Sequence, residues 1–599
     1  MSYSGLFRNP DKQILALQWV NKTNSIIRVL FTLLIFIVWV VDLGYPEQSV
    51  FPIHSLLYGS ILVVLGQNYL YRILFIYKQS SRLRLLFEGF LTILLHFAAT
   101  IQFGWTENWA WLQAYESVLT NVLISLLFFI ELSRLSLTVN KLSLHPALIF
   151  ILSFISVIFV GTLLLKLPNA TVSGITWIDA LFTATSAVCV TGLVVVDTAT
   201  AFTGMGQTII LILFQLGGLG VMTFTSFFGF FFKGGQSLQS QLFLKDYINE
   251  DNISKVGSTL IKIILFTLVF ELFVGGLIFT LIDASLFESA YDRLFFSIFH
   301  SISAFCNAGF STLTNGLYET GFRTAYHVHL VLGIAIIVGG IGFPVIVSFA
   351  QFAKRVVGNW YNLFTKRDSF YHHTPRVFNI NTRLTTISTA ILLAVGFVTY
   401  WIFEQNNTLA GLDGYAKFVT AFFGSVTPRT AGFNTVDMTQ LALPTVLIYL
   451  ILMWIGASPG STGGGLKTTT FAVAVLNALS IAKGKDRVEV FNRQIDPETV
   501  RKAFAVMLLS FIVIGFGVFL VLFLNPDLQI LEVAFEVFSA FSTVGLSLGI
   551  TAKLTTGSKL VISIIMFLGR VGTLTVLVAF IRKTRSLRYK YPQEGVFIS

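Results

Sequence analysis

Four short segments share a residue pattern suited to holding a cation. Each has a small or β-branched residue, then glycine, then leucine or phenylalanine; the segments are Cys189–Leu193, Cys306–Phe310, Arg429–Phe433 and Ser542–Leu546. Glycine adopts backbone angles closed to other residues, which lets consecutive carbonyl groups turn toward a common axis. A ring of carbonyl oxygens replaces the water shell of a permeating ion. The pattern therefore predicts a cation pore. The expected filter residues are Val190, Thr191, Gly192, Asn307, Ala308, Gly309, Thr430, Ala431, Gly432, Thr543, Val544 and Gly545.

The spacing of the four segments indicates an internal repeat. Their glycines are 117, 123 and 113 residues apart. A second glycine-rich segment follows three of them, at Gly217–Gly220, Gly339–Gly342 and Gly569–Gly572. Small residues let helices approach closely in lipid, where hydrophobicity does not drive them together. We therefore expect one structural unit used four times.

Composition places these units in a membrane. Of 599 residues, 55% are hydrophobic and 12% are charged, too few charges to cover a water-facing surface. Apolar runs of about 20 residues, enough to span the hydrocarbon layer, recur along the chain. The net charge of +11 comes from basic loops on one side, which is typical of a cytoplasmic face and not of nucleic-acid binding. No stretch between the runs is long enough for a soluble catalytic domain, which argues against an enzyme or a pump. Two cysteines exclude a disulfide framework.

The predicted fold is an all-α polytopic membrane protein with twelve spans and both termini in the cytoplasm. Four spans precede four repeats, and each repeat has a span, a short helix, a filter loop and a return span. The short helices are expected at 177–188, 290–305, 414–427 and 529–541, and return spans at 208–232, 326–350 and 558–581. The expected divisions are an N-terminal four-helix extension, 1–140, and pore repeats at 141–235, 236–355, 356–495 and 496–599.

The third return span departs from the others. Ten residues rich in glycine and proline interrupt it, and they cannot remain helical. We expect them to form a loop beneath the filter. They are Gly456, Ala457, Ser458, Pro459, Gly460, Ser461, Thr462, Gly463, Gly464 and Gly465.

Three basic residues stand out near this pore. Arg570 lies about 12 residues into its span, near the bilayer midplane at ~1.5 Å per residue, where a charge is costly and usually functional. A gate and a salt bridge with Glu271 are both open interpretations. Lys467 suits a gate element or extends to the interface. It does not complete a phosphate-binding loop, because Leu466 separates it from the preceding glycine.

Arg429 is unexpected at the mouth of a cation filter. A side chain that pointed into the pore would repel the ion, so we expect it to point back into protein. Glu536, in the fourth short helix, is the candidate partner for an ion pair that supports the filter.

Together these motifs resemble a known family. The segments Thr427–Asn434, Gly456–Thr468 and Gly339–Pro344 are similar to the TrkH/KtrB branch of the TrkH/KtrB/HKT superfamily of potassium transporters. The resemblance covers roughly residues 145–585. It implies a pseudo-fourfold pore in each subunit, potassium uptake across a bacterial cytoplasmic membrane and a homodimer. It also implies a cytosolic regulatory ring of the TrkA/KtrA type, so that a nucleotide binds the partner and this chain carries no cofactor of its own.

The resemblance also assigns roles to residues. By motif position, the interrupted third return helix, 456–468, and Arg570 form the gate. A glycine in every filter loop goes with potassium preference in that family, and all four are present. A sodium-permeable or sodium-coupled transporter of the same fold is the alternative. No role carries over to residues 1–140.

Overall fold

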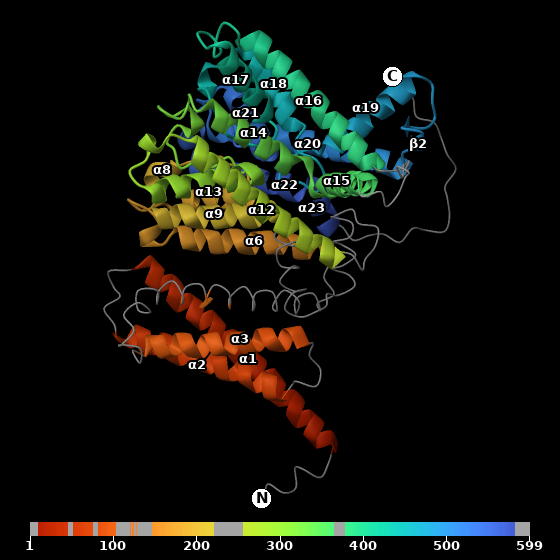
Figure 1. Ribbon diagram of the computed structural model, residues 1–599. Helices are drawn as coiled ribbons and strands as arrows, with labels where there is room; N and C mark the ends of the chain where they lie inside the picture. The colour runs from red at the N-terminus through yellow and green to blue at the C-terminus, as the bar shows by residue number, and fades with distance from the viewer. Residues whose placement is uncertain are drawn as a thin grey trace, which may run out of the picture.

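The computed structural model describes residues 10–45, 52–75, 82–103, 120, 123–124, 127, 146–220, 256–364 and 378–580. These residues are mostly helical (Figure 1), which agrees with the predicted all-α class. The strand structure among them is one short antiparallel pair, β1 (Glu489–Val490) and β2 (Arg493–Gln494).

Four successive units each contain a long helix, a short helix and a return helix. Unit 1 consists of α6 (Pro146–Leu165), α7 (Trp177–Val188) and α9 (Gly204–Leu219). Unit 2 consists of α12 (Val256–Leu281), α13 (Ala290–Cys306) and α14 (Tyr326–Ile341). Unit 3 consists of α16 (Ile380–Glu404), α17 (Gly414–Val426) and α18 (Leu443–Trp454). Unit 4 consists of α20 (Pro497–Leu524), α21 (Ile530–Phe541) and α22 (Thr556–Val571).

Further helices follow the return helices or lie in the connections. Three follow return helices: α15 (Phe343–Phe364), α19 (Thr468–Ala482) and α23 (Thr573–Phe580). The connections hold α8 (Thr198–Ala201), η4 (Pro168–Ala170), η6 (Ala284–Leu286), η7 (Gly316–Tyr318), η8 (Met438–Gln440) and η9 (Thr551–Lys553).

Three of the four short helices, α7, α13 and α17, begin at a polar side chain that caps them. Thr176, before α7, accepts a hydrogen bond from Asp179 N at 3.2 Å, and Ser289 and Asp413 cap α13 and α17 in the same way. A cap satisfies backbone N–H groups that have no partner in the first helical turn. All four helices start and end within one residue of the predicted ranges. At 12 to 17 residues they are too short to cross a bilayer.

Five described helices are long and apolar enough to span a membrane. The segments are Ile26–Gly44, Ala147–Leu165, Thr259–Leu281, Ile380–Glu404 and Pro497–Leu524. A multi-pass helical membrane protein is therefore confirmed, whereas the count of twelve spans stays a prediction.

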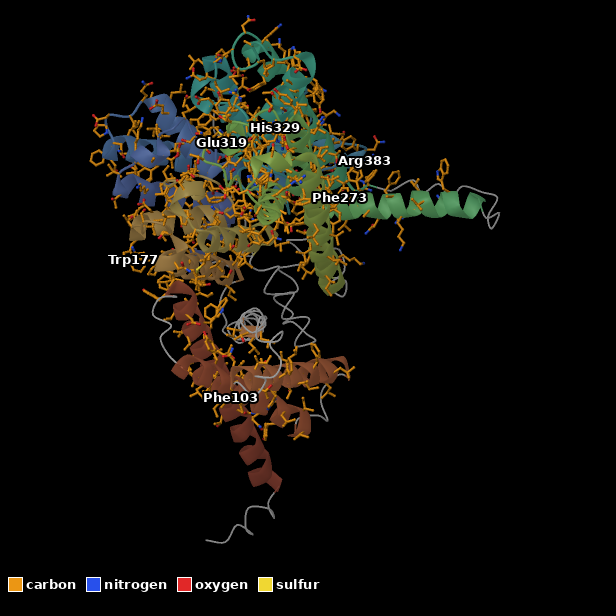
Figure 2. The ribbon with its side chains drawn as sticks, turned by 60° about the vertical axis from the view of Figure 1, so that its left-hand side comes forward. Phe103, Trp177, Phe273, Glu319, His329 and Arg383 are labelled. Atoms are coloured by element: carbon orange, nitrogen blue, oxygen red, sulfur yellow. The ribbon has the colours of Figure 1, made fainter. Side chains whose placement is uncertain are left out.

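Two of the predicted return spans are bent in the structure. The axes of α14 and α15 differ by 102°, and those of α22 and α23 by 89°. The bends occur at Gly342 and Gly572, whose φ angles are +97° and +90°. A glycine with positive φ ends a helix, so each of the predicted return spans 326–350 and 558–581 consists of two helices. After its bend, α15 projects from the body of the molecule (Figure 2).

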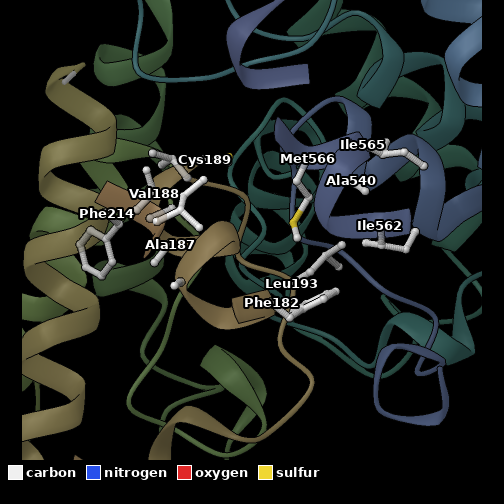
Figure 3. Packing of buried hydrophobic residues seen from close by; sticks show 14 of the residues in the cluster. Phe182, Ala187, Val188, Cys189, Leu193, Phe214, Ala540, Ile562, Ile565 and Met566 are labelled. Carbon is white, nitrogen blue, oxygen red and sulfur yellow. The ribbon is translucent and has the colours of Figure 1, made fainter. Parts of the chain in front are cut away.

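The four units close into a ring. The return helix of each unit packs against the short helix of the next: α9 on α13, α14 on α17, α18 on α21 and α22 on α7. At the closing contact, Lys559 Nζ of α22 lies 2.6 Å from Asp179 Oδ1 of α7. Figure 3 shows the buried side chains at this junction, with Phe182 and Leu193 of unit 1 near Met566 of unit 4. The short helices of all four units are thereby held around one centre.

The N-terminal helices form a separate group, visible below the units in Figure 1. They are α1 (Pro10–Gly44), α2 (Pro52–Phe75) and α3 (Arg82–Gln102), and they have a hydrophobic core of their own. Arg72 of α2 pairs with Glu88 of α3 at 2.9 Å. The fourth of the spans predicted before the repeats is expected at 115–132, and most of it lies outside the described residues.

Candidate functional site

The four glycine loops have one backbone conformation in common. Gly192, Gly309, Gly432 and Gly545 have φ angles of +89°, +70°, +77° and +93°. The residue two places earlier also has a positive φ in every loop: Val190, Asn307, Thr430 and Thr543. A positive φ is a true outlier for a β-branched residue such as valine or threonine, and such strain persists only where surrounding structure enforces it. The loops therefore share a strained, repeated geometry.

The loops also contact one another in cyclic order. A Cβ built on Gly192 would lie 2.5 Å from the carbonyl oxygen of Ala308 in the next loop. The equivalent distances are 2.9 Å from Gly309 to Ala431 O, 2.3 Å from Gly432 to Val544 O and 2.2 Å from Gly545 to Thr191 O. Each glycine is thus directly beside a backbone carbonyl of the next loop, and the fourth loop meets the first. The structure brings all twelve expected filter residues to one ring.

Buried hydroxyl groups hold three of the loops, and the sequence reasoning missed them. Ser186 Oγ accepts from Gly192 N at 3.1 Å, and Ser539 Oγ accepts from Gly545 N at 3.0 Å. Ser303 Oγ donates to Phe310 O at 2.8 Å. Each serine precedes its glycine by six residues, a spacing that could have identified them. In unit 3 the corresponding hydroxyl lies five residues before Gly432: Thr427 Oγ1 donates to Phe433 O at 2.5 Å.

The glycine-rich segments of the return helices lie against the ends of the short helices. Cβ atoms on Gly217, Gly339 and Gly569 would lie 2.1, 1.9 and 1.7 Å from carbonyl oxygens of Val188, Phe305 and Phe541. Each of these carbonyls is four residues before a filter glycine. Glycine at these positions allows helix and loop to approach closely, as expected for small residues at membrane helix contacts.

The loop between α18 and α19, residues 455–467, lies directly against three filter loops. Thr462 Oγ1 donates to Phe305 O at 3.2 Å, and Gly464 N donates to Thr543 Oγ1 at 2.9 Å. A Cβ on Gly463 would lie 2.2 Å from Thr430 Oγ1. The side-chain amide of Asn307 lies 3.3 Å from Thr462 Oγ1. The interruption predicted from the glycine and proline content is therefore present and touches the filter loops.

The same loop also fills the break between α14 and α15. Ser458 N donates to Gly340 O at 3.1 Å, and Phe343 N donates to Gly460 O at 2.9 Å. Within the loop, Ser461 Oγ donates to Ser458 O at 2.6 Å. Backbone N–H and C=O groups that lose their helical partners at the two breaks thus form hydrogen bonds with each other. Buried backbone groups in a membrane need such partners.

Three cations hold carbonyl oxygens of this loop. Arg570 donates to Thr462 O and to Gly217 O, and Lys467 Nζ donates to Gly463 O at 2.7 Å. Arg429 donates to Gly456 O at 3.3 Å. The structure therefore gathers Arg429, Lys467 and Arg570 at the loop, one from each of three segments.

The ion pairs considered from the sequence are not formed between the described residues. Glu271 accepts from Gln215 Nε2 at 2.9 Å, and its partner is not Arg570. Glu536, expected to pair with Arg429, instead accepts from Thr551 Oγ1 at 2.5 Å. The pairing fails because Arg429 points toward α14 and α16, whereas Glu536 faces the segment after its own filter loop. Glu536 is therefore not the partner of Arg429.

The described residues contain no group of three or more His, Cys, Asp or Glu side chains that could hold a metal ion. Cys189 and Cys306 are both buried free thiols. Among the described residues, the oxygens that converge are backbone carbonyls, which suit a monovalent cation.

Comparison with known proteins gives consistent matches. A family model described as TrkH, cation transport protein, matches residues 120–590. Ktr system potassium uptake protein B of Bacillus subtilis is 37% identical over 455 residues, which cover 76% of this chain and 96% of that protein. Potassium/sodium uptake protein NtpJ of Enterococcus hirae is 36% identical over 463 residues, covering 76% and 97%. The structure of the potassium transporter TrkH from Vibrio parahaemolyticus is similar in fold, with a TM-score of 0.58, 17% identity, and coverage of 87% of this chain and 97% of that one.

Proposed function

The chain belongs to the TrkH family of cation transport proteins, and we propose that it takes up potassium through a pore at the centre of its four units. Its family and its named relatives are transporters, so the expectation of a transporter and not an enzyme is confirmed. The ion would be held by backbone carbonyls of residues 190–192, 307–309, 430–432 and 543–545.

The cyclic contact of the four filter glycines is the observation that carries this proposal. A Cβ on each would come within 2.9 Å or less of a carbonyl of the next loop. Because the loops converge on one centre, their carbonyls can replace the hydration shell of a dehydrated cation. The C-terminal ends of the four short helices are directed at the loops, and the negative end of a helix dipole favours a cation there. Relatives named as potassium uptake proteins make potassium the preferred substrate.

The loop at 456–467 is proposed as the gate. It touches three filter loops, and Lys467 and Arg570 both donate to its carbonyls. Two positive charges under the filter raise the energy of a cation that passes this level, since like charges repel strongly where water is excluded. Uptake would then require the loop and these side chains to move together.

The resemblance to the family also supports a proposal for assembly and location. We place the protein in a bacterial cytoplasmic membrane with both termini inside, as a homodimer. The name "Ktr system" of the relatives supports a system with further components. A cytosolic ring of the TrkA/KtrA type that binds a nucleotide is the proposed partner.

Uptake by cells that lack their own potassium transporters tests the function. Expression of the chain should restore growth on low potassium. Added potassium should inhibit rubidium uptake more strongly than added sodium does. Sodium entry at an equal rate would instead favour the alternative suggested by the name of NtpJ, a potassium/sodium uptake protein. No uptake of either ion, with the protein present in the membrane, would overturn the proposal.

A further inference from the structure

Arg429 is a buried cation whose charge has no carboxylate beside it among the described residues. Its side chain is 7% exposed, and it belongs to none of the ion pairs that these residues form. Its two Nη atoms donate to carbonyl oxygens of Thr389 and Gly456, both at 3.3 Å. A guanidinium has five N–H donors, and its Nε has no partner here.

A small cavity lies beside this guanidinium. Its volume is about 20 Å³. The lining residues come from α14, α16, the end of α17 and the loop at 456–467, and they are Ile336, Ile337, Gly340, Thr389, Leu393, Val426, Arg429 and Ala457. The hydroxyl of Thr389, which is 8% exposed, also lacks a partner. Two unpaired polar groups, one of them charged, therefore line one buried space.

The size and the chemistry of the cavity restrict its occupant. A cavity of this volume has room for one water molecule or one monatomic ion. A water molecule would satisfy the two donors but would leave the charge of Arg429 uncompensated. A buried charge is tolerated when it is paired, and an anion would supply that pairing. Lys467 and Arg570 at the same loop add to the positive potential, and Glu271 and Glu536 are bonded elsewhere.

We propose that this cavity binds one small monovalent anion of the chloride class, held by Arg429 Nε and the Thr389 hydroxyl. The anion neutralises a positive charge that directly precedes Thr430 of the filter, so it lowers the repulsion between the pore wall and a bound cation. The site rests on the cavity and its donors, and it stands whether or not the pore conducts potassium.

Bromide provides the direct test. Crystals of the full-length protein grown in bromide should show an anomalous peak within hydrogen-bonding distance of Arg429 Nε. Replacing chloride by gluconate should lower the unfolding temperature of the purified protein by a few degrees, because a bound ligand stabilises the folded state. Thr389→Val should abolish this anion dependence, and Thr389→Ser should keep it.

Thr386→Val is the matched control. Thr386 lies one turn away on α16, and its hydroxyl donates to Thr382 O of the same helix at 2.8 Å. This variant should keep the chloride-dependent unfolding temperature of the unmodified protein. Water density alone beside Arg429, with equal unfolding temperatures in chloride and gluconate, would overturn the proposal. Neither readout depends on transport, so failure here is distinct from failure of the proposed function.

Discussion

At the scale of the residue, a filter glycine meets two requirements that no other amino acid meets together. Gly432 has a φ of +77°, and a Cβ there would lie 2.3 Å from Val544 O. The first requirement concerns the conformation of its own loop, and the second concerns the approach of the next loop. A substitution would therefore displace two loops at once.

Gly432→Ala should reduce potassium uptake by roughly tenfold to a hundredfold, because forcing a residue into this conformation costs about 1–3 kcal/mol. Rubidium uptake into uptake-deficient cells measures this effect, with protein in the membrane quantified in parallel. Gly414→Ala is the control, since Gly414 opens the short helix of the same unit and a Cβ there meets nothing within 4 Å. Equal uptake by both variants would contradict the assigned role of Gly432.

Arg570 connects the proposed gate to the return helix of unit 1, through Thr462 O and Gly217 O. Arg570→Ala removes both bonds and a positive charge, and charged hydrogen bonds contribute about 1.5–3 kcal/mol each. We expect basal cation flux into liposomes to rise by roughly tenfold. Arg570→Lys keeps the charge but not the paired donors, and its flux should be intermediate. If the alanine variant conducts like the unmodified protein, Arg570 is not part of the barrier.

Single residues also show where prediction from sequence ends. The filter glycines could be identified because their spacing repeats and because only glycine suits a positive φ beside a neighbouring carbonyl. The pairing of Arg429 with Glu536 could not be judged, because the direction of a side chain depends on which helices surround it. Ser186, Ser303 and Ser539 were missed because a buried serine has no signal in hydropathy, although their common offset from the glycines was available.

At the scale of the element, close helix packing depends on the glycine-rich segments of the return helices. Gly569 of α22 lies against the end of α21, where a Cβ would be 1.7 Å from Phe541 O. The contact is with backbone, which cannot rotate away as a side chain can. Helix α22 can therefore lie this close to the end of α21 only because residue 569 has no side chain.

Gly569→Ala should destabilise the protein by at least about 1–3 kcal/mol, the usual cost of overpacking, and lower its unfolding temperature by about 5 °C. Thermal unfolding in detergent gives the comparison. Gly515→Ala on α20 serves as control, because a Cβ at Gly515 meets nothing within 4 Å. An unfolding temperature of Gly569→Ala equal to that of the control would show that the two elements are not in this contact.

The short helices and the interrupted third return helix were predictable from local signals: polar caps, length and a run of glycine and proline. The bends at Gly342 and Gly572 were not. Hydropathy reports only that both flanks are apolar, and a helix that turns by 102° or 89° keeps the same composition. Whether Gly342 only allows close packing or also ends its helix depends on the loop at 456–467, which occupies the break in unit 2. Local sequence does not show this contact.

At the scale of the whole molecule, the four units and the N-terminal helices are two separately built parts. Helices α1–α3 have their own core, and the match to the family model begins only at residue 120. The two parts touch where Asn169 Nδ2, in unit 1, donates a hydrogen bond to Leu43 O of α1 at 3.2 Å. The ring of units closes on itself without contribution from these helices.

Deletion of residues 1–140 should therefore leave a folded transporter, because a domain with its own hydrophobic core can fold without its neighbour. Potassium uptake per molecule should stay within about twofold of that of the full chain. Size-exclusion chromatography and rubidium uptake measure the two properties. A truncated protein that folds but does not transport would show that the N-terminal helices contribute to the pore.

The central claim is that carbonyls of four loops surround one dehydrated cation. Diffraction from crystals grown in rubidium tests it most directly, through the anomalous signal of the ion. The account predicts rubidium peaks on the axis between Gly192, Gly309, Gly432 and Gly545, at the level of their carbonyl oxygens. Crystals that contain rubidium elsewhere but none on this axis would contradict it.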